Sequence, residues 1–338
     1  MSRSLLPDAE SIARQILQRN GLAGRTLRRA PSTSNEVFLA DDHVIRINRD
    51  SGNANRLLRE AELCLALPAL AWTPQIVEYG RQNRTAFLIV RRKRGMTLAR
   101  WWPDMRPSQR REAIGQLAGC MRAIHSTSVP GGLDPITDTP QMLGSAGNPV
   151  LPLLHGLQRL RSVANADPKV IDEVESTVHS LAPSVAIYPE TGLVHGDLSL
   201  ENVLWDGSCI SAVLDFEWAR GAPRELDLDV LCRFLVLPDL HVPDAYRGRV
   251  GPADYREVIG WLADSYPELF TPAELDRRLA LFAIAYEVRA VLANPPKAPA
   301  DRLSPAHPYR RLMDAASGGG PAAGLVRPII GQGAARRR

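Results

Sequence analysis

The N-terminal part of the chain alternates short strand-like stretches with polar turns. The stretches lie at residues 26–29, 37–40, 44–47, 76–79 and 86–90. Because short strands joined by tight turns favour antiparallel pairing, the pattern predicts a five-stranded antiparallel sheet. Apolar positions at helical spacing predict one helix over residues 8–18 and a second over residues 55–67, which Pro68 ends.

Beyond Gly95 the pattern changes to long helices. Apolar side chains recur at i, i+3 and i+4 from Pro107 to His125, as on one face of a helix. The other elements predicted here are helices at 150–164, 170–180, 255–265 and 272–292 and a strand-rich interruption at 193–216. The Gly-, Ala- and Arg-rich end offers little apolar surface to bury. We therefore expect a small α+β N-lobe (1–93), a helical C-lobe (94–316) and a flexible tail (317–338).

Composition excludes several classes of protein. Of the 338 residues, 45% are hydrophobic and 23% are charged, as is usual for a globular protein. No apolar run approaches the ~20 residues of a membrane helix, and the N-terminus does not resemble a secretory signal. The four cysteines are widely separated, which favours free thiols over a metal site. We expect a cytoplasmic protein with no membrane partner.

The net charge of +4 is unevenly distributed. Residues 81–111 hold ten basic groups and one acidic group, Asp104. Such a run is most often a solvated face, and no recognition motif accompanies it, so we expect no nucleic-acid partner.

Three polar residues flank two short apolar strands late in the chain. Asp197 and Asn202 precede the stretch 203–205, and Asp215 follows the stretch 210–214. A hairpin of these strands would place the start of the first beside the end of the second. Transfer of a phosphoryl group to a hydroxyl requires a group that orients the acceptor and oxygen ligands for Mg²⁺. The spacing therefore predicts that Asp197, Asn202 and Asp215 converge on one small volume, where their oxygens could serve both needs.

Two motifs in this segment carry a family resemblance. The chain reads His-Gly-Asp-Leu-Ser-Leu-Glu-Asn over 195–202 and Asp-Phe-Glu over 215–217. This resembles the aminoglycoside phosphotransferase and choline kinase group of the protein-kinase-like superfamily. The resemblance implies a bilobal protein-kinase-like fold, with the N-lobe binding the nucleotide and the C-lobe carrying the catalytic loop and the acceptor site. It also implies that Asp197 is the catalytic base or the residue that orients the acceptor. Asn202 and Asp215 would bind Mg²⁺, and His195 would support the loop.

The same resemblance assigns roles in the N-lobe. The polar loop Ser32, Thr33 and Ser34 takes the place of a phosphate-binding loop, although it is not glycine-rich. Arg46 stands where the family usually has lysine, and arginine can also clamp phosphate. Glu60 is the partner that the family pattern implies for Arg46. The alternative from the residues alone is that Arg46 faces solvent from an edge strand.

The acceptor is less defined than the reaction. The resemblance implies ATP (or GTP) and Mg²⁺ as cofactors and an aminoglycoside-type or other antibiotic as acceptor, with a monomer or homodimer as the working unit. Residues 239–314 hold eleven acids and ten basic groups, so no strongly acidic cleft for a polycation is evident. Asp264, Glu268 and Glu287 are candidate acceptor ligands. A housekeeping metabolite kinase, acting on choline, a sugar or a nucleoside, and a catalytically silent kinase-fold binding protein remain as alternatives.

Overall fold

The computed structural model describes residues 8–30, 32, 35–48, 51–82, 85–131, 143, 148–185, 192–319 and 321–336. The chain forms two compact units. The first comprises Met1–Leu98, Pro130–Asp134 and Asn202–Ala219, and the second comprises Ala99–Val129, Pro135–Glu201 and Arg220–Arg338. Late residues therefore return to the N-terminal unit, because the segment from Asn202 to Ala219 packs there.

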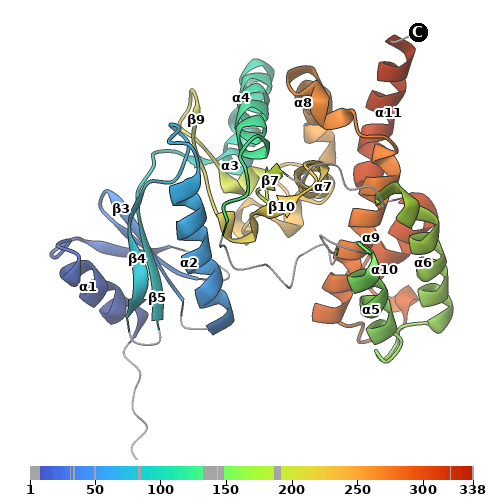
Figure 1. Ribbon diagram of the computed structural model, residues 1–338, viewed down its shortest axis with the longest axis horizontal. Coiled ribbons are helices and arrows are strands. Elements are labelled where there is room, and N and C mark those ends of the chain that lie inside the picture. Colours follow the sequence, from blue (N-terminus) through green and yellow to red (C-terminus); the bar gives the residue numbers. More distant parts are fainter. Residues whose placement is uncertain are drawn as a thin grey trace, which may run out of the picture. The chain divides into compact units, whose positions relative to one another are not determined.

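The first unit is built on a five-stranded antiparallel sheet with the order β1-β2-β3-β5-β4, which confirms the sheet predicted from the sequence. Its strands are β1 (Leu27–Ala30), β2 (Glu36–Ala40), β3 (His43–Asn48), β4 (Ile76–Gln82) and β5 (Thr85–Arg91). Helix α1 (Ala9–Arg19) and helix α2 (Ser51–Ala66) lie on either side of it (Figure 1).

Each face of this sheet has its own core. Ile45 and Ile47 of β3 pack with Ile16 of α1. Leu88 of β5 packs on the other side with Leu57 of α2. Since side chains alternate along a strand, Arg46 lies on the α2 side of β3. Strand β3 is the middle strand of the sheet, so the alternative of a solvated edge-strand arginine is wrong.

A smaller three-stranded sheet completes the first unit. It has the order β6-β8-β9, with β6 (Met96–Thr97), β8 (Val203–Trp205) and β9 (Ile210–Val213). The hairpin of β8 and β9 confirms the pairing predicted from the sequence. Gly95 enters β6 with a φ of +117°, and a Cβ there would lie 2.5 Å from the carbonyl oxygen of Trp205. The turn into β6 therefore requires glycine.

The second unit is mainly helical. Its helices are α4 (Pro107–His125), α5 (Leu151–Leu160), α6 (Pro168–Leu181), α7 (Glu225–Val236), α8 (Val258–Ser265), α9 (Leu275–Ala293), α10 (Pro308–Asp314) and α11 (Pro321–Arg336), and the short helix α3 (Leu98–Trp101) leads into it. Strands β7 (Gly192–Val194) and β10 (Arg220–Ala222) form a two-stranded antiparallel sheet. Most of α9 is buried, and it contacts helices α5, α7, α10 and α11.

The C-terminal end differs from the flexible tail that its composition suggested. Residues 321–336 form α11, which contacts α9 and α7. Ala322 and Val326 are fully buried there. Small residues let two helices approach closely, so an Ala- and Gly-rich segment can pack where its low hydrophobicity predicts disorder. Among the described residues, no helix is both long and apolar enough to cross a membrane.

Candidate active site

A buried ion-pair network lies between β3, α2 and the end of β9. Arg46 Nη1 donates hydrogen bonds to Oε1 and Oε2 of Glu60 at 2.6 and 2.7 Å. Its Nη2 donates to Oδ1 of Asp215 at 2.7 Å. The side chains of Arg46 and Glu60 are only 14% and 4% exposed. The structure therefore pairs Arg46 with Glu60, the partner that the family resemblance implies, and adds Asp215 to that pair.

Burial sets the electrostatics of this network. Burial raises the pKa of Glu60 to about 7. The charge of Arg46 acts to lower this pKa, whereas the carboxylates of Asp215 and Glu217 raise it further. Burial by itself would lower the pKa of Arg46, but the carboxylates of Glu60, Asp215 and Glu217 outweigh it, so this pKa lies above its ordinary value. Arg46 is consequently a permanent cation, as a group that binds phosphate must be.

The open end of the β8–β9 hairpin brings Asn202 and Asp215 together. The backbone N–H of Leu214 donates to the carbonyl of Asn202 at 2.8 Å. Asp215 itself has left-handed backbone angles, with φ 66° and ψ 61°. Such a conformation is uncommon for a residue other than glycine and is characteristic of functional sites. The hairpin thus presents an amide and a carboxylate side by side.

This donor set fits a magnesium ion. Mg²⁺ binds oxygen ligands and uses one or two carboxylates together with substrate phosphates. Asn202 offers an amide oxygen and Asp215 a carboxylate whose side chain is 32% exposed while it accepts from Arg46. A bound Mg²⁺ would neutralise phosphate charge, and the nearby guanidinium of Arg46 would add a second positive group.

Helix α2 anchors the segment that follows Asp215, which sequence reasoning missed. The backbone N–H of Phe216 donates to Oε1 of Glu60 at 3.3 Å. Arg59 donates to the carbonyl of Ala219 at 2.6 Å, and the guanidinium of Arg56 lies 4.2 Å from the centre of the Trp218 ring. The one sequence signal was the spacing of Arg56, Arg59 and Glu60, which places them on one face of a helix.

In the second unit, one carboxylate holds the backbone of the loop that begins at His195. Asp227 Oδ2 accepts the backbone N–H of His195 at 2.9 Å, and its Oδ1 accepts the N–H of Gly196 at 2.8 Å. The N–H of Asp197 in turn donates to Nδ1 of His195 at 3.3 Å. His195 is fully buried, whereas Asp197 is partly exposed. The loop backbone is thus fixed from within while the Asp197 side chain remains accessible.

His125 completes this arrangement, and no sequence motif points to this residue. Its Nε2 lies 3.0 Å from Oδ2 of Asp227, and its Nδ1 lies 3.2 Å from the hydroxyl of Tyr266. Burial acts to raise the pKa of Asp227, but the hydrogen bond and charge of His125, the charge of His195 and the His195 N–H outweigh it, so this pKa lies below its ordinary value. Asp227 is therefore ionised at neutral pH.

The polar loop before β2 is only partly described. Ser32 is exposed, whereas Thr33 and Ser34 lie outside the described residues. At the end of the loop, Asn48 Nδ2 donates to Oδ1 of the buried Asn35 at 2.9 Å, which ties it to β3. The predicted phosphate-binding role of Ser32, Thr33 and Ser34 stays a prediction.

The three candidate acceptor ligands each pair with an arginine of the chain. Asp264 accepts from Arg111 at 3.2 Å, and Glu268 accepts from Arg122 at 3.4 Å. Glu287 accepts two hydrogen bonds from Arg311, both at 2.8 Å, and this pair is largely buried. Exposed pairs rearrange at little cost, whereas a buried bidentate pair does not.

Comparison with known proteins agrees with this geometry. A model of the phosphotransferase enzyme family matches residues 26–261, about 70% of the chain. The search of curated proteins found no match to this chain.

Among solved structures, the ADP-bound aminoglycoside phosphotransferase APH(2'')-Ib is similar, with a TM-score of 0.63, 16% sequence identity, and coverage of 93% of this chain and 99% of that one. The ternary complex of APH(2'')-IIa with streptomycin and ATP has a TM-score of 0.61 and 16% identity over 95% of this chain and 99% of that one. The complex of APH(2'')-IIIa with GDP and kanamycin has a TM-score of 0.61 and 17% identity over the same shares.

Proposed function

Because the chain belongs to the phosphotransferase enzyme family and is a phosphotransferase with an alcohol group as acceptor, we propose that it transfers a phosphoryl group from ATP or GTP to a small natural product, an aminoglycoside-type or other antibiotic. The Arg46–Glu60–Asp215 network carries this proposal, because it joins a phosphate-binding cation to a metal-binding carboxylate. Solved relatives bind ADP, ATP or GDP, which supports a nucleotide donor.

Each site residue has a role in this proposal. Asp197 orients the acceptor hydroxyl and takes its proton as the oxygen attacks the terminal phosphorus of the nucleotide. The bond from that phosphorus to the bridging oxygen breaks, and the nucleoside diphosphate leaves. His195 supports the loop through its contact with the Asp197 N–H. Asn202 and Asp215 bind Mg²⁺, which supplies charge neutralisation at the phosphate oxygens. Arg46 binds the donor phosphates while Glu60 fixes its orientation, and Ser32, Thr33 and Ser34 add hydroxyl and N–H donors.

We further propose that residues 1–93 bind the nucleotide and that residues 94–316 carry the catalytic loop and the acceptor site. The protein would act in the cytoplasm, where nucleoside triphosphates are abundant. Arginine in place of lysine at position 46 is compatible with this role, because a planar guanidinium can contact Glu60, Asp215 and a phosphate through different N–H groups.

A second candidate is an acceptor with few positive charges, such as a neutral sugar-like or macrolide-type compound. Polycationic acceptors need carboxylates that are available to bind ammonium groups. Here Glu287 is held by two hydrogen bonds from Arg311 in a largely buried pair, and Asp229 is held by Arg233 at 3.0 Å. Releasing either carboxylate would leave a buried arginine uncompensated, which costs about 3–5 kcal/mol.

The test is phosphorylation of an acceptor panel by the purified protein with Mg²⁺ and ATP or GTP. The panel contains aminoglycosides, macrolides, neutral sugars, choline and nucleosides, and product is identified by mass spectrometry. We expect turnover of an antibiotic and a loss of about 100-fold or more in Asp197→Ala. An exposed-acid control, Asp244→Asn, should keep its activity, since the side chain of Asp244 is 88% exposed and pairs with Arg247 at the surface. Unchanged turnover in Asp197→Ala would remove Asp197 from its proposed role.

Nucleotide binding is measured separately by calorimetry. We expect Mg²⁺-dependent binding that Asn202→Ala and Asp215→Asn weaken. If no magnesium-dependent binding occurs in the parent protein, a catalytically silent binding protein becomes the better description.

A further inference from the structure

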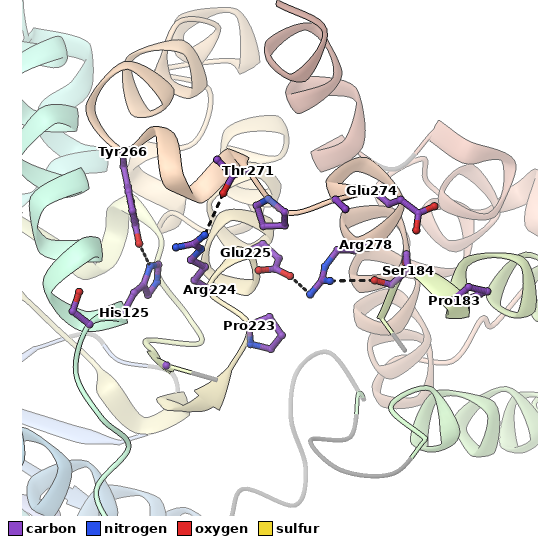
Figure 2. A pocket seen from close by; sticks show the side chains of 14 residues that line it. His125, Pro183, Ser184, Pro223, Arg224, Glu225, Tyr266, Thr271, Glu274 and Arg278 are labelled. Atoms are coloured by element: carbon purple, nitrogen blue, oxygen red, sulfur yellow. Dashed lines mark hydrogen bonds and ion pairs between the residues drawn. The ribbon is translucent and has the colours of Figure 1, made fainter. Parts of the chain in front are cut away.

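A cavity of about 690 Å³ lies within the second unit, apart from the residues assigned to phosphoryl transfer. It is formed where the end of α4, the start of α7 and the segment between α8 and α9 meet. Figure 2 shows Arg224 below Thr271, to which it is joined by a hydrogen bond, and the Glu225–Arg278 ion pair beside it. The volume would hold a compact organic molecule.

Arg224 gives this cavity its charge. Its Nη2 donates to the hydroxyl of Thr271 at 3.4 Å. Tyr266 lines the same cavity. Among the described residues, no carboxylate forms an ion pair with Arg224. The other cations that line or adjoin the cavity are matched by acids, since Arg278 pairs with Glu225 and Arg277 pairs with Glu274 at 3.1 Å. Arg224 therefore leaves about one positive charge at the cavity.

The remaining walls are apolar or aromatic. Pro183, Pro223, Pro272 and Ala273 line the cavity together with Tyr266. A rigid wall of proline rings favours a flat or branched apolar body over a hydrated polar one. The carboxylates of Glu268 and Glu274 lie near Arg224 or on the lining, and they disfavour a ligand with more than one negative charge.

We propose that this cavity is a ligand site for a small organic monocarboxylate with a compact apolar body. The carboxylate binds the guanidinium of Arg224, which can offer two parallel N–H groups, and the apolar body packs against the proline rings and Tyr266. The cavity shares no lining residue with the proposed nucleotide and metal site, and the proposal does not depend on that site.

A chain of hydrogen bonds leads from this cavity to the catalytic loop. Tyr266 lines the cavity together with Arg224, and its hydroxyl lies 3.2 Å from His125. His125 lies 3.0 Å from Asp227, which accepts the N–H groups of His195 and Gly196. A ligand whose apolar body packs against Tyr266 would therefore displace the hydroxyl that faces His125. Occupancy of the cavity should change how firmly Asp227 holds the loop.

Binding is tested on the full chain by calorimetry and ligand-observed NMR with benzoate and cyclohexanecarboxylate as probes, and benzamide as the uncharged match for benzoate. We expect saturable binding of at least one carboxylate, and a loss of about tenfold or more in affinity both for benzamide and in Arg224→Gln. Arg256→Gln is the matched control, because Arg256 is exposed and does not line the cavity. Equal affinity in Arg224→Gln, or no binding by either carboxylate, would overturn the proposal.

Coupling to the loop is tested by amide hydrogen exchange with and without the bound carboxylate. We expect a change of about threefold or more in exchange at His195 and Gly196 in the parent protein and none in Arg224→Gln. If a probe binds at Arg224 and exchange at these amides does not change, the coupling is refuted and only the site stands.

Discussion

Arg46 donates hydrogen bonds to both carboxylate oxygens of Glu60, at 2.6 and 2.7 Å, and so connects the middle strand of the sheet to helix α2. Replacing Arg46 by glutamine removes the cation and the bond to Asp215. We expect kcat/KM for the nucleotide to fall by about 100-fold or more, as for other lost charge-stabilising donors. Arg46→Lys keeps the charge but not the forked geometry of the guanidinium. Its kcat/KM for the nucleotide should fall by about tenfold.

The same pair predicts a limited loss of stability. Breaking a buried ion pair usually costs about 3–5 kcal/mol. Since the pKa of Glu60 lies at about 7, its carboxyl can take up a proton when Arg46 is lost. We therefore expect the free energy of unfolding, measured by thermal unfolding, to fall by only about 1–3 kcal/mol. Arg28→Gln, at an exposed position of β1, is the control.

An Arg46→Gln protein with the parent's nucleotide KM would exclude Arg46 from phosphate binding.

Gly95→Ala should destabilise the first unit. Its φ of +117° is unfavourable for alanine, and the new Cβ would lie 2.5 Å from the Trp205 carbonyl oxygen. We expect a loss of about 2–3 kcal/mol in denaturant unfolding. Gly119→Ala is a matched control with the opposite sign, since Gly119 lies in helix α4 with nothing within 4 Å of a new Cβ and should gain about 0.5–1 kcal/mol. Equal effects of the two changes would contradict this account.

His241 should make the protein less stable in mild acid. Burial, with the charges of Arg233 and Arg311, lowers the pKa of His241 from 6.5 to about 4. The unfolded chain therefore binds the proton more readily, so the stability present above the unfolded pKa is lost as pH falls from about 6.5 towards 4. We expect a loss of up to about 2 kcal/mol at about pH 5.

Melting curves of His241→Gln across this pH range provide the measurement. Glutamine does not titrate, so the decline in Tm between about pH 8 and about pH 5 should be smaller than in the parent. His179→Gln removes a histidine whose side chain is 62% exposed and should leave the decline unchanged. Identical slopes in the parent and His241→Gln would rule out His241 as the source.

Asp227→Asn should affect both stability and turnover. An amide can accept only one of the two loop N–H bonds well and brings an N–H₂ group towards a buried donor. We expect a loss of about 2–4 kcal/mol in unfolding and of tenfold or more in kcat. The KM for the nucleotide should change much less, because Asp227 contacts the loop of His195 and Gly196. A selective rise in the nucleotide KM would argue against this division of roles.

The sequence predicted the elements better than their contacts. The strands of the first sheet were predictable because short alternating stretches and tight turns mark them locally, and the hairpin of Val203 to Val213 followed from its central turn. Whether Arg46 lies on a middle or an edge strand was not predictable, because it depends on which strands flank β3. The hydrogen bond between His125 and Asp227 was not predictable either, because the two residues are 102 positions apart and no local sequence pattern marks it.

The ion-pair partners of the charged residues were also not predictable from the sequence. Counting acids and bases in residues 239–314 indicated near balance, but only the fold reveals that Glu287 is held by Arg311 within that balance. The helix at 321–336 was missed for a different reason, because its burial comes from contact with α9 and α7 and not from its own hydrophobicity.

The left-handed backbone of Asp215 decides how mutagenesis of this position can be interpreted. Alanine would change the charge and also place a residue with little tolerance for φ 66° in that conformation. Asparagine accepts left-handed angles nearly as well as any residue with a side chain. Asp215→Asn thus separates electrostatics from conformation, whereas Asp215→Ala combines a catalytic defect with a folding defect. Any loss of activity reported for an alanine variant alone would overstate the contribution of the carboxylate.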